Sequence, residues 1–121
     1  MKSILLVSHG SHNPKTKQEI ADLTQKIKSA TQTKHVRFAF LEIESPSIPE
    51  GIKQCVEEGA DEVLLLLNFL NSGRHVDEDI PAIVADEAKK YPQCTLSVSK
   101  PVGQHDGILK LFLDLIEMPY A

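Results

Sequence analysis

The sequence predicts a single α/β domain in which helices cover both faces of a parallel β-sheet. Short runs of branched aliphatic residues alternate along the chain with longer segments whose apolar residues recur every three or four positions. Strands that alternate with helices in this way are joined by right-handed crossovers, which produce parallel pairing. With 121 residues, we expect one domain over residues 1–121.

Four segments have the character of strands. The first, residues 3–7, is a short buried strand that ends at a Gly–Ser turn. The second covers residues 36–42. The third, residues 62–70, is apolar almost throughout, as expected for a central strand covered on both faces. The fourth, residues 94–99, carries a weaker signal.

Four further segments have the periodicity of helices. Residues 14–30 form the first, and residues 48–58 the second, which ends before Gly59. In the third, Asp79 and Pro81 have the character of a cap and a first helical turn, and the helix continues to about residue 90.

The fourth predicted helix spans residues 104–117 and has an apolar face. That face carries Ile108, Leu111, Phe112 and Leu115. Either packing on the core or contact with a second subunit would explain it.

The strand order 2-1-3-4, typical of flavodoxin-like sheets, fits a chain that starts with a short buried strand. In open parallel sheets of this kind, ligands bind beyond the carboxyl ends of the strands, near the point where the order reverses. The residues that follow each strand are therefore the first candidates for a functional site.

Two histidines and a carboxylate follow the three strands that this order makes neighbours. His9 follows the first strand, Glu42 ends the second, and His75 lies in the loop after the third. Because neighbouring strands lie roughly 4.8 Å apart, the three strand ends fall within roughly 10 Å of one another. Such a set suits a divalent ion such as Co²⁺, Ni²⁺ or Fe²⁺, and it can also transfer protons. Each residue alone has an ordinary structural explanation, but their convergence predicts a metal-binding and catalytic site.

Other polar residues are weaker candidates for the same site. His12 lies in the following turn and could support the ligands, and Glu44 lies on the same side as Glu42 by strand alternation. His35 and His105 lie away from this edge, so we expect both at the surface.

The net charge and the hydropathy of the chain disfavour nucleic-acid and membrane partners. The formal net charge of −4 disfavours a nucleic-acid partner, and no apolar run reaches transmembrane length. The first residues are too short an apolar stretch for a signal peptide, so we expect a cytoplasmic protein without a membrane partner. Cys55 and Cys94 stand outside any Cys-x-x-Cys motif, and we expect two buried thiols.

Four short motifs occur in an order and spacing that resemble the small sirohydrochlorin chelatases. They are His9-Gly10-Ser11; Phe40-Leu41-Glu42 followed by Pro46-Ser47-Ile48; Gly73-x-His75 with Asp79-Ile80-Pro81; and Lys100-Pro101-Val102-Gly103. Each motif alone is weak, but four in order are fairly specific. The match runs from the first strand to the last helix.

The resemblance implies a class II chelatase half-domain that needs no nucleotide and no permanent cofactor. It implies that cobalt, iron or nickel is a substrate, inserted into sirohydrochlorin or a related tetrapyrrole towards cobalamin or siroheme. By the same resemblance, His9 and His75 hold the metal and accept pyrrole protons, while Glu42 assists. Single-domain members of this length usually pair as homodimers, which implies a homodimer here.

The carboxylates at the periphery of such a substrate need positive or N–H partners. Arg74, Lys100 and the backbone N–H groups of Ser11 and Ser72 are the candidates. For Arg74 and Lys100, a solvated surface charge is an equal alternative.

Three residues depart from the family pattern. His12 stands where the family commonly has arginine, Asn68 where it commonly has proline, and Arg74 where it has a small residue. These departures concern substrate positioning more than metal binding.

Other functions stay open at this stage. The hydroxyl-rich loop over residues 8–16 would suit a phosphate or flavin, although the chain lacks well-placed aromatic residues to flank a flavin ring. A histidine-phosphatase-like activity is disfavoured because Arg37 and Arg74 are the only arginines. A receiver-type signalling domain is disfavoured because the first strand does not end in carboxylates. A non-catalytic metal carrier with the same three ligands cannot be separated from a chelatase by sequence.

Overall fold

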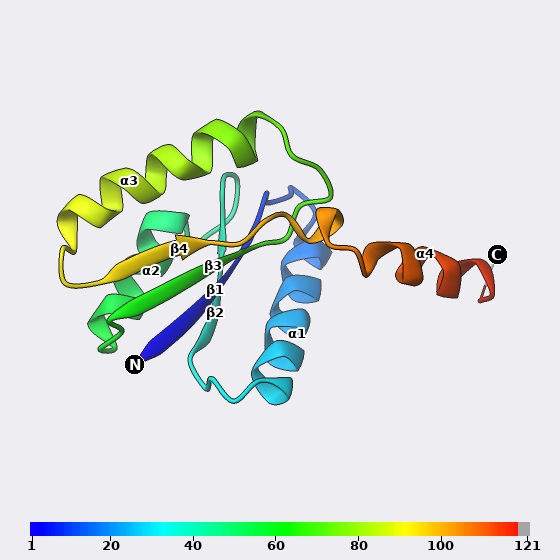
Figure 1. The fold of residues 1–121 in the computed structure, drawn as a ribbon, viewed down its shortest axis with the longest axis horizontal. Helices are drawn as coiled ribbons and strands as arrows, with labels where there is room; N and C mark the ends of the chain where they lie inside the picture. The colour runs from blue at the N-terminus through cyan, green and yellow to red at the C-terminus, as the bar shows by residue number, and fades with distance from the viewer. Residues whose placement is uncertain (119–121) are drawn as a thin grey trace.

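The computed structural model describes residues 1–118 and contains one four-stranded parallel sheet (Figure 1). The strands are β1 (Lys2–Ser8), β2 (Val36–Phe40), β3 (Glu62–Leu67) and β4 (Thr95–Val98). Their spatial order is β2-β1-β3-β4, and all three ladders are parallel. The predicted α/β class and the order 2-1-3-4 are confirmed.

Helices cover both faces of this sheet, as predicted. They are α1 (Pro14–Ala30), α2 (Ile48–Glu57), α3 (Ile80–Lys90) and α4 (Ile108–Ile116), with a π-helical turn η1 (His75–Asp79) before α3 and a 3₁₀ turn η2 (Val102–Gln104) before α4. Figure 1 shows α1 and α3 on opposite sides of the sheet. Residues of α2 and α3 pack on one face, and residues of α1 pack on the other.

Local signals fix the beginnings of α1 and α2. Asn13 caps α1 by accepting a hydrogen bond from the backbone N–H of Lys15 at 3.0 Å, and a proline follows it at the first helical position. Ser47 and Glu50 form a reciprocal capping box at the start of α2. These polar caps satisfy donors that would otherwise lack partners at each helix start.

The main core lies between the sheet and the pair α2 and α3, and it is aliphatic. Its members include Leu5, Val7, Ile52, Val63, Leu65 and Ile80, each without exposed surface. Cys55 and Cys94 are free and buried in the same core, as predicted. Burial raises the pKa of both thiols, so they stay protonated and behave as small apolar groups.

Three predicted strands are shorter than expected. The second ends at Phe40 rather than residue 42, because the chain turns away and Ile43 adopts a positive φ of 73°. The third ends at Leu67 rather than residue 70, and Leu70 is 60% exposed. β4 is trimmed by one residue at each end.

Asp79 holds the position before α3 and Pro81 lies in its first turn, as predicted, but the side chain of Asp79 does not cap the helix. Helical geometry already begins at His75, and the backbone N–H of Ile80 donates to the carbonyl of His75, which closes a π-helical turn. Asp79 lies inside this helical segment and makes no capping hydrogen bond. His75 is therefore on a helical turn and not in a flexible loop.

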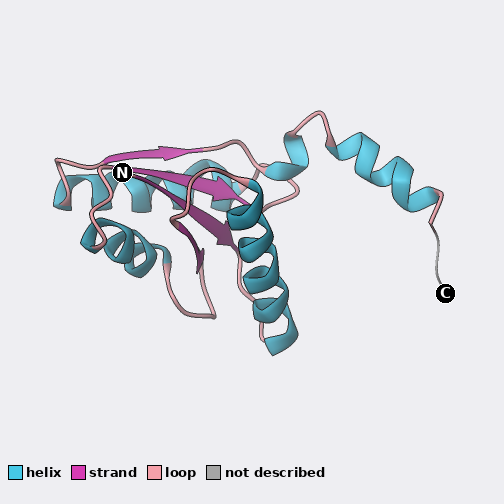
Figure 2. Ribbon diagram, turned by 90° about the horizontal axis from the view of Figure 1, so that it is seen from below, coloured by secondary structure: helices cyan, strands magenta, loops and turns pink. Residues whose placement is uncertain are grey.

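The last helix also differs from its prediction. It starts at Ile108 rather than residue 104, after the turn η2, and its apolar face does not pack on the core. Figures 1 and 2 both show α4 projecting away from the sheet and the other helices. Every residue over 109–118 is exposed.

The face of β3 towards α1 is consequently only half covered. Val63, Leu65 and Leu67, which point to the main core, are buried, whereas Leu64 and Leu66 on the opposite face are not fully buried. The expectation of a third strand covered on both faces is wrong for this reason. None of the helices within residues 1–118 is long and apolar enough to cross a membrane.

Replacing the central core residue Leu65 with alanine should lower the free energy of unfolding by about 2–5 kcal/mol, because the cavity lies in a fully buried site. The matched change Leu70→Ala, at a side chain that is 60% exposed, should cost no more than about 0.5 kcal/mol. Urea unfolding measures both. Equal losses in the two variants would contradict the described core.

Candidate metal centre

Three chain segments at the carboxyl edge of the sheet carry the candidate ligands. His9 directly follows β1, Glu42 lies two residues after β2, and His75 opens the turn η1 after β3. Parallel hydrogen bonding continues beyond the strands, because the N–H groups of Leu41 and Glu42 donate to the carbonyls of Ser8 and His9 at 2.8 and 3.0 Å. The backbone itself therefore holds the segment of Glu42 beside His9.

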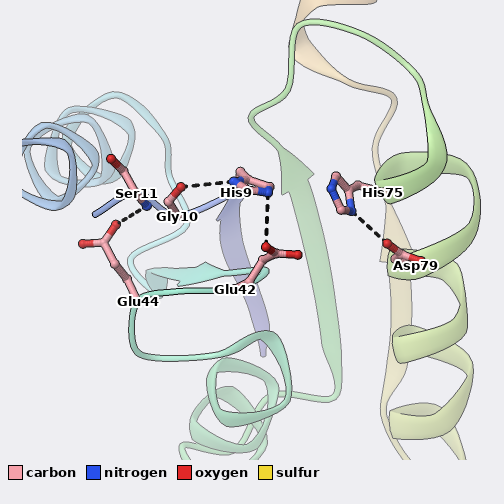
Figure 3. Close-up of polar contacts among 7 residues, drawn as sticks. All are labelled: His9, Gly10, Ser11, Glu42, Glu44, His75 and Asp79. Carbon is pink, nitrogen blue, oxygen red and sulfur yellow. Dashed lines mark hydrogen bonds and ion pairs between the residues drawn. The ribbon is translucent and has the colours of Figure 1, made fainter. Parts of the chain in front are cut away.

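The structure brings the three predicted side chains together (Figure 3). Nε2 of His9 lies 3.6 Å from Oε2 of Glu42, and the ring centroids of His9 and His75 are 5.1 Å apart. One ligand atom from each of the three residues lies within 4.8 Å of the others. Modest side-chain rotations would bring all three onto one ion, whose bonds to nitrogen and oxygen ligands are about 2.0–2.2 Å long. Within residues 1–118, this is the one group of histidine, cysteine and acidic side chains with such geometry.

Hydrogen bonds determine which ring nitrogen each histidine presents. Nδ1 of His75 lies 2.8 Å from Oδ2 of Asp79, and Nδ1 of His9 lies 3.1 Å from the carbonyl oxygen of Gly10. Carboxylate and carbonyl oxygens only accept, so each Nδ1 carries the proton in a neutral ring. Both histidines therefore offer Nε2 as the ligand atom, and Asp79 is the kind of partner that orients a metal-binding histidine.

The candidate site is open to solvent on one side. The side chains of His9, Glu42 and His75 keep 43%, 51% and 42% of their surface exposed. Three ligands at an accessible edge leave coordination positions for water or for another molecule. The arrangement suits an ion that enters and leaves more than an ion that serves a structural role.

Gly10 makes the close approach of the two segments possible. Its φ of +104° lies in the region that favours glycine, and a Cβ atom at this position would lie 2.0 Å from the carbonyl oxygen of Glu42. Any larger residue would therefore push the segment of Glu42 away from His9.

Glu44 does not join Glu42 at the candidate site. Figure 3 shows its carboxylate directed to the other side, where Oε1 accepts a hydrogen bond from the backbone N–H of Ser11 at 2.8 Å. The expectation that alternation places Glu44 beside Glu42 is wrong, because the strand has already ended and Ile43 turns the chain. The N–H of Ser11, a predicted substrate donor, already has a carboxylate acceptor in this structure.

Comparison with known proteins places the chain in a family. The CbiX family model matches residues 3–118. The chain belongs to the CbiX family. The resemblance to the small sirohydrochlorin chelatases is thereby confirmed.

Named relatives of this CbiX-family chain include chelatases for two metals. The chloroplastic sirohydrochlorin ferrochelatase of Arabidopsis thaliana is 32% identical over 114 residues, which is 94% of this chain and 51% of that protein. The sirohydrochlorin cobaltochelatase of Methanococcus maripaludis is 34% identical over 139 aligned positions, covering 94% of this chain and 96% of that protein. The chain thus spans about half of the first relative and nearly all of the second.

A solved structure of the sirohydrochlorin chelatase SirB from Bacillus subtilis subspecies spizizenii, in complex with cobalt, has the same architecture. Its TM-score is 0.89 at 30% identity, and the superposition covers 97% of this chain and 50% of SirB. That protein therefore binds cobalt on the fold that this CbiX-family chain shares.

The remaining predicted substrate residues are exposed in segments that follow the carboxyl ends of strands. Ser72 and Lys100 are exposed in the segments that follow β3 and β4. Arg74 is also exposed, and its Nε lies 3.8 Å from the carboxylate of Glu78, one helical turn away. His12 is exposed in the turn before α1, and His35 and His105 are exposed as predicted.

Two polar contacts beside the ligands were not anticipated from the sequence. Asn68, which departs from the family pattern, donates from Nδ2 to Oγ of Ser8 at 3.0 Å and so joins the ends of β3 and β1 next to His9. Asp79 contacts His75, and the spacing of four residues between them was the signal that could have indicated this pair.

Substituting Gly10 with alanine should disturb this edge more than the same change at Gly59, which has the same φ of +104° but no atom within 4 Å of its Cβ position. Gly59→Ala should cost about 1–2 kcal/mol of unfolding free energy from backbone conformation alone. Gly10→Ala should cost a further ~1–3 kcal/mol from overpacking. Urea unfolding measures both, and equal costs would show that the approach of Glu42 is not constrained.

Proposed function

We propose that this chain inserts Co²⁺, Fe²⁺ or Ni²⁺ into sirohydrochlorin or a related tetrapyrrole, as in the formation of cobalamin- or siroheme-type cofactors. The domain would span residues 1–121 and act as a homodimer. The observation that carries the proposal is the convergence of His9, Glu42 and His75 to within 4.8 Å at the open carboxyl edge of the sheet. The named functions of the relatives support it, since they are sirohydrochlorin chelatases for iron and for cobalt.

The metal ion is a substrate in this reaction. His9 and His75 bind it through Nε2, and Glu42 supplies a third oxygen ligand or accepts a proton. Ligation requires neutral imidazoles, so the site loses metal when the histidines are protonated. The positions that the protein leaves open on the ion are those where pyrrole nitrogens attach.

Insertion exchanges one divalent ion for two pyrrole protons, so charge balances. The protons must reach bases near the macrocycle centre, and Glu42 together with the histidines are the bases at this edge. Nε2 of His9 and the carboxylate of Glu42 are 3.6 Å apart, so a small side-chain movement would bring them to the separation of about 2.6–3.2 Å that direct proton transfer requires. As the ion moves to the macrocycle, the imidazoles that it leaves become free to accept those protons.

The peripheral carboxylates of the substrate would contact donors around the edge. Arg74 and Ser72 precede His75 in the segment after β3, and Lys100 follows β4. The backbone N–H of Ser11 binds the carboxylate of Glu44 at 2.8 Å, which indicates that this donor suits a carboxylate. A substrate carboxylate would take this position by displacing Glu44.

Chelatase activity can be tested with purified protein, sirohydrochlorin and Co²⁺, Fe²⁺ or Ni²⁺ in the absence of air, by following the absorbance change of metal insertion. His9→Ala and His75→Ala should each lower the rate above background by at least about 100-fold, because each removes a metal ligand and a base. His35→Ala, at an exposed histidine far from the edge, is the matched control and should keep full activity.

The outcomes separate the proposal from its alternatives. No rate above background with any of the three metals would refute the chelatase activity. Metal binding that still depended on His9 and His75 would then identify a metal carrier, and the absence of binding would leave a phosphate-binding loop as the alternative.

Asp79→Asn should weaken Co²⁺ binding about 10–100-fold, as for other partners that orient a metal-binding histidine. The amide oxygen can still accept a hydrogen bond from Nδ1 of His75, but it lacks the negative charge of the carboxylate. Asp77→Asn is the control, because Asp77 is exposed on the same turn and is absent from the group of three ligands. Isothermal titration with Co²⁺ measures both, and equal affinities in the two variants would remove Asp79 from the site.

A further inference from the structure

The turn that carries Glu42 has a strained backbone. The N–H of Glu44 donates to the carbonyl of Glu42 at 2.8 Å, and Ile43 between them has a φ of 73°. A hydrogen bond from residue i+2 to residue i across a positive φ is typical of the classic γ-turn, which is rare and strained. The β-branched side chain of Ile43 makes this conformation more costly still. Ile43 is also 49% exposed, so its burial offers little compensation.

Contacts with the loop over residues 9–11 hold both ends of this turn. At one end, the N–H of Glu42 donates to the carbonyl of His9 at 3.0 Å. The carbonyl oxygen of Glu42 also lies against Gly10, where a Cβ atom would be 2.0 Å away. At the other end, Oε1 of Glu44 accepts a hydrogen bond from the N–H of Ser11 at 2.8 Å (Figure 3). The strained turn is thus held between two contacts with the loop that begins at His9.

The bond between Glu44 and Ser11 is the contact that another molecule can replace. It is made by a side chain at a half-buried position, whereas the contacts of Glu42 continue the backbone pairing of β1 with β2. Its donor keeps its place without Glu44, because Oγ of Ser11 separately accepts a hydrogen bond from the N–H of Asn13 at 3.0 Å. A substrate carboxylate presents the same acceptor oxygens as Glu44 and therefore competes for the same N–H.

We propose that Glu44 is a positioning residue whose bond to Ser11 acts as a latch on Glu42. With the latch closed, the γ-turn is held and Glu42 stays beside His9, within reach of the ion. When a peripheral carboxylate of the tetrapyrrole takes the N–H of Ser11, Glu44 is released. Ile43 then relaxes to a negative φ and Glu42 moves away from the ion. This inference rests on the proposed chelatase function and deepens it.

The latch couples the arrival of the substrate to the release of the metal. Because the substrate carboxylate binds Ser11 only when Glu44 has left, substrate binding shifts the turn to its open form. The ion then loses one oxygen ligand at the moment when pyrrole nitrogens are ready to replace it. The carboxylate of Glu42 becomes free to accept a proton from a pyrrole N–H.

Titration with Co²⁺ in the absence of any tetrapyrrole tests the closed latch. Glu44→Ala removes the acceptor and should weaken Co²⁺ binding about 10-fold, as for other residues that position a metal ligand. Glu44→Gln keeps an oxygen that accepts from the N–H of Ser11, so it should retain the affinity of the unmodified chain. Glu57→Ala, at an exposed glutamate of α2, is the control for the loss of one negative charge and should also retain it.

A double variant shows whether Glu44 acts through Glu42. Glu42→Ala removes the ligand itself and should weaken Co²⁺ binding. Adding Glu44→Ala to that variant should cause no further loss, because no carboxylate is left to position. Circular dichroism of each variant, compared with that of the unmodified chain, shows that a change in affinity does not come from unfolding.

Steady-state insertion of Co²⁺ into sirohydrochlorin tests the opening of the latch. Glu44→Gln should lower the KM for sirohydrochlorin several-fold, because a neutral amide competes less strongly than a carboxylate for the N–H of Ser11. Its kcat should be unchanged, since Glu42 is still held in place. A residue that served only the folding of the loop would not lower KM while Co²⁺ affinity and kcat stay the same.

Four results would overturn the latch and leave the chelatase function standing. Unchanged Co²⁺ affinity in Glu44→Ala would mean that Glu42 needs no support. An equal loss in Glu44→Gln would mean that the charge attracts the ion and the hydrogen bond is irrelevant. Additive losses in the double variant would mean that Glu44 acts without Glu42. An unchanged KM in Glu44→Gln would mean that the substrate does not compete for Ser11.

The unmodified chain separates these results from a failure of the proposed function. If it neither binds Co²⁺ nor inserts it above background, the chelatase function and the latch are refuted together.

Discussion

Parallel pairing of β1 with its two neighbours is the interaction on which the candidate site depends. The pairing does not stop where the strands end, because Leu41, Glu42 and Asn68 each donate a backbone hydrogen bond to residues 7–9 of the first strand and its following turn. These bonds fix the positions, along the strand direction, of the segments that carry His9 and Glu42. The side chain of Asn68 adds a further link to Ser8. The ligands are therefore held by backbone geometry and need little support from one another.

The architecture could be predicted from the sequence because its determinants are local. The aliphatic runs, the caps at Asn13 and Ser47 and the glycine after α2 each act over a few residues. The position of α4 could not be predicted, because an apolar helix face has the same pattern whether it packs on its own sheet or on another molecule. The incomplete burial of one face of β3 could not be predicted either, since a continuous apolar run in the sequence does not indicate which element packs on each face of the strand.

The convergence of His9, Glu42 and His75 followed from the strand order, which places three strand ends side by side. The contact between His75 and Asp79 did not follow from the sequence, because a π-helical turn places Asp79 within the helical segment, while an aspartate two residues before a proline is typical of a helix cap. The position of Glu44 depended on the positive φ of Ile43, a conformation that an isoleucine gives no reason to expect. In both cases the expected rule, helix capping or strand alternation, failed because the backbone turns with an unusual geometry.

The open arrangement of two imidazoles and one carboxylate has a consequence for how an ion would be chosen. Sites built from nitrogen and oxygen ligands generally bind the divalent first-row metals in an order of affinity that rises to copper. A centre that imposes neither a closed geometry nor a sulfur ligand has no means of reversing this order. Discrimination between cobalt, iron and nickel would then rest on which free ion the cell makes abundant, so the same fold could yield different products in different organisms without a change in its ligands.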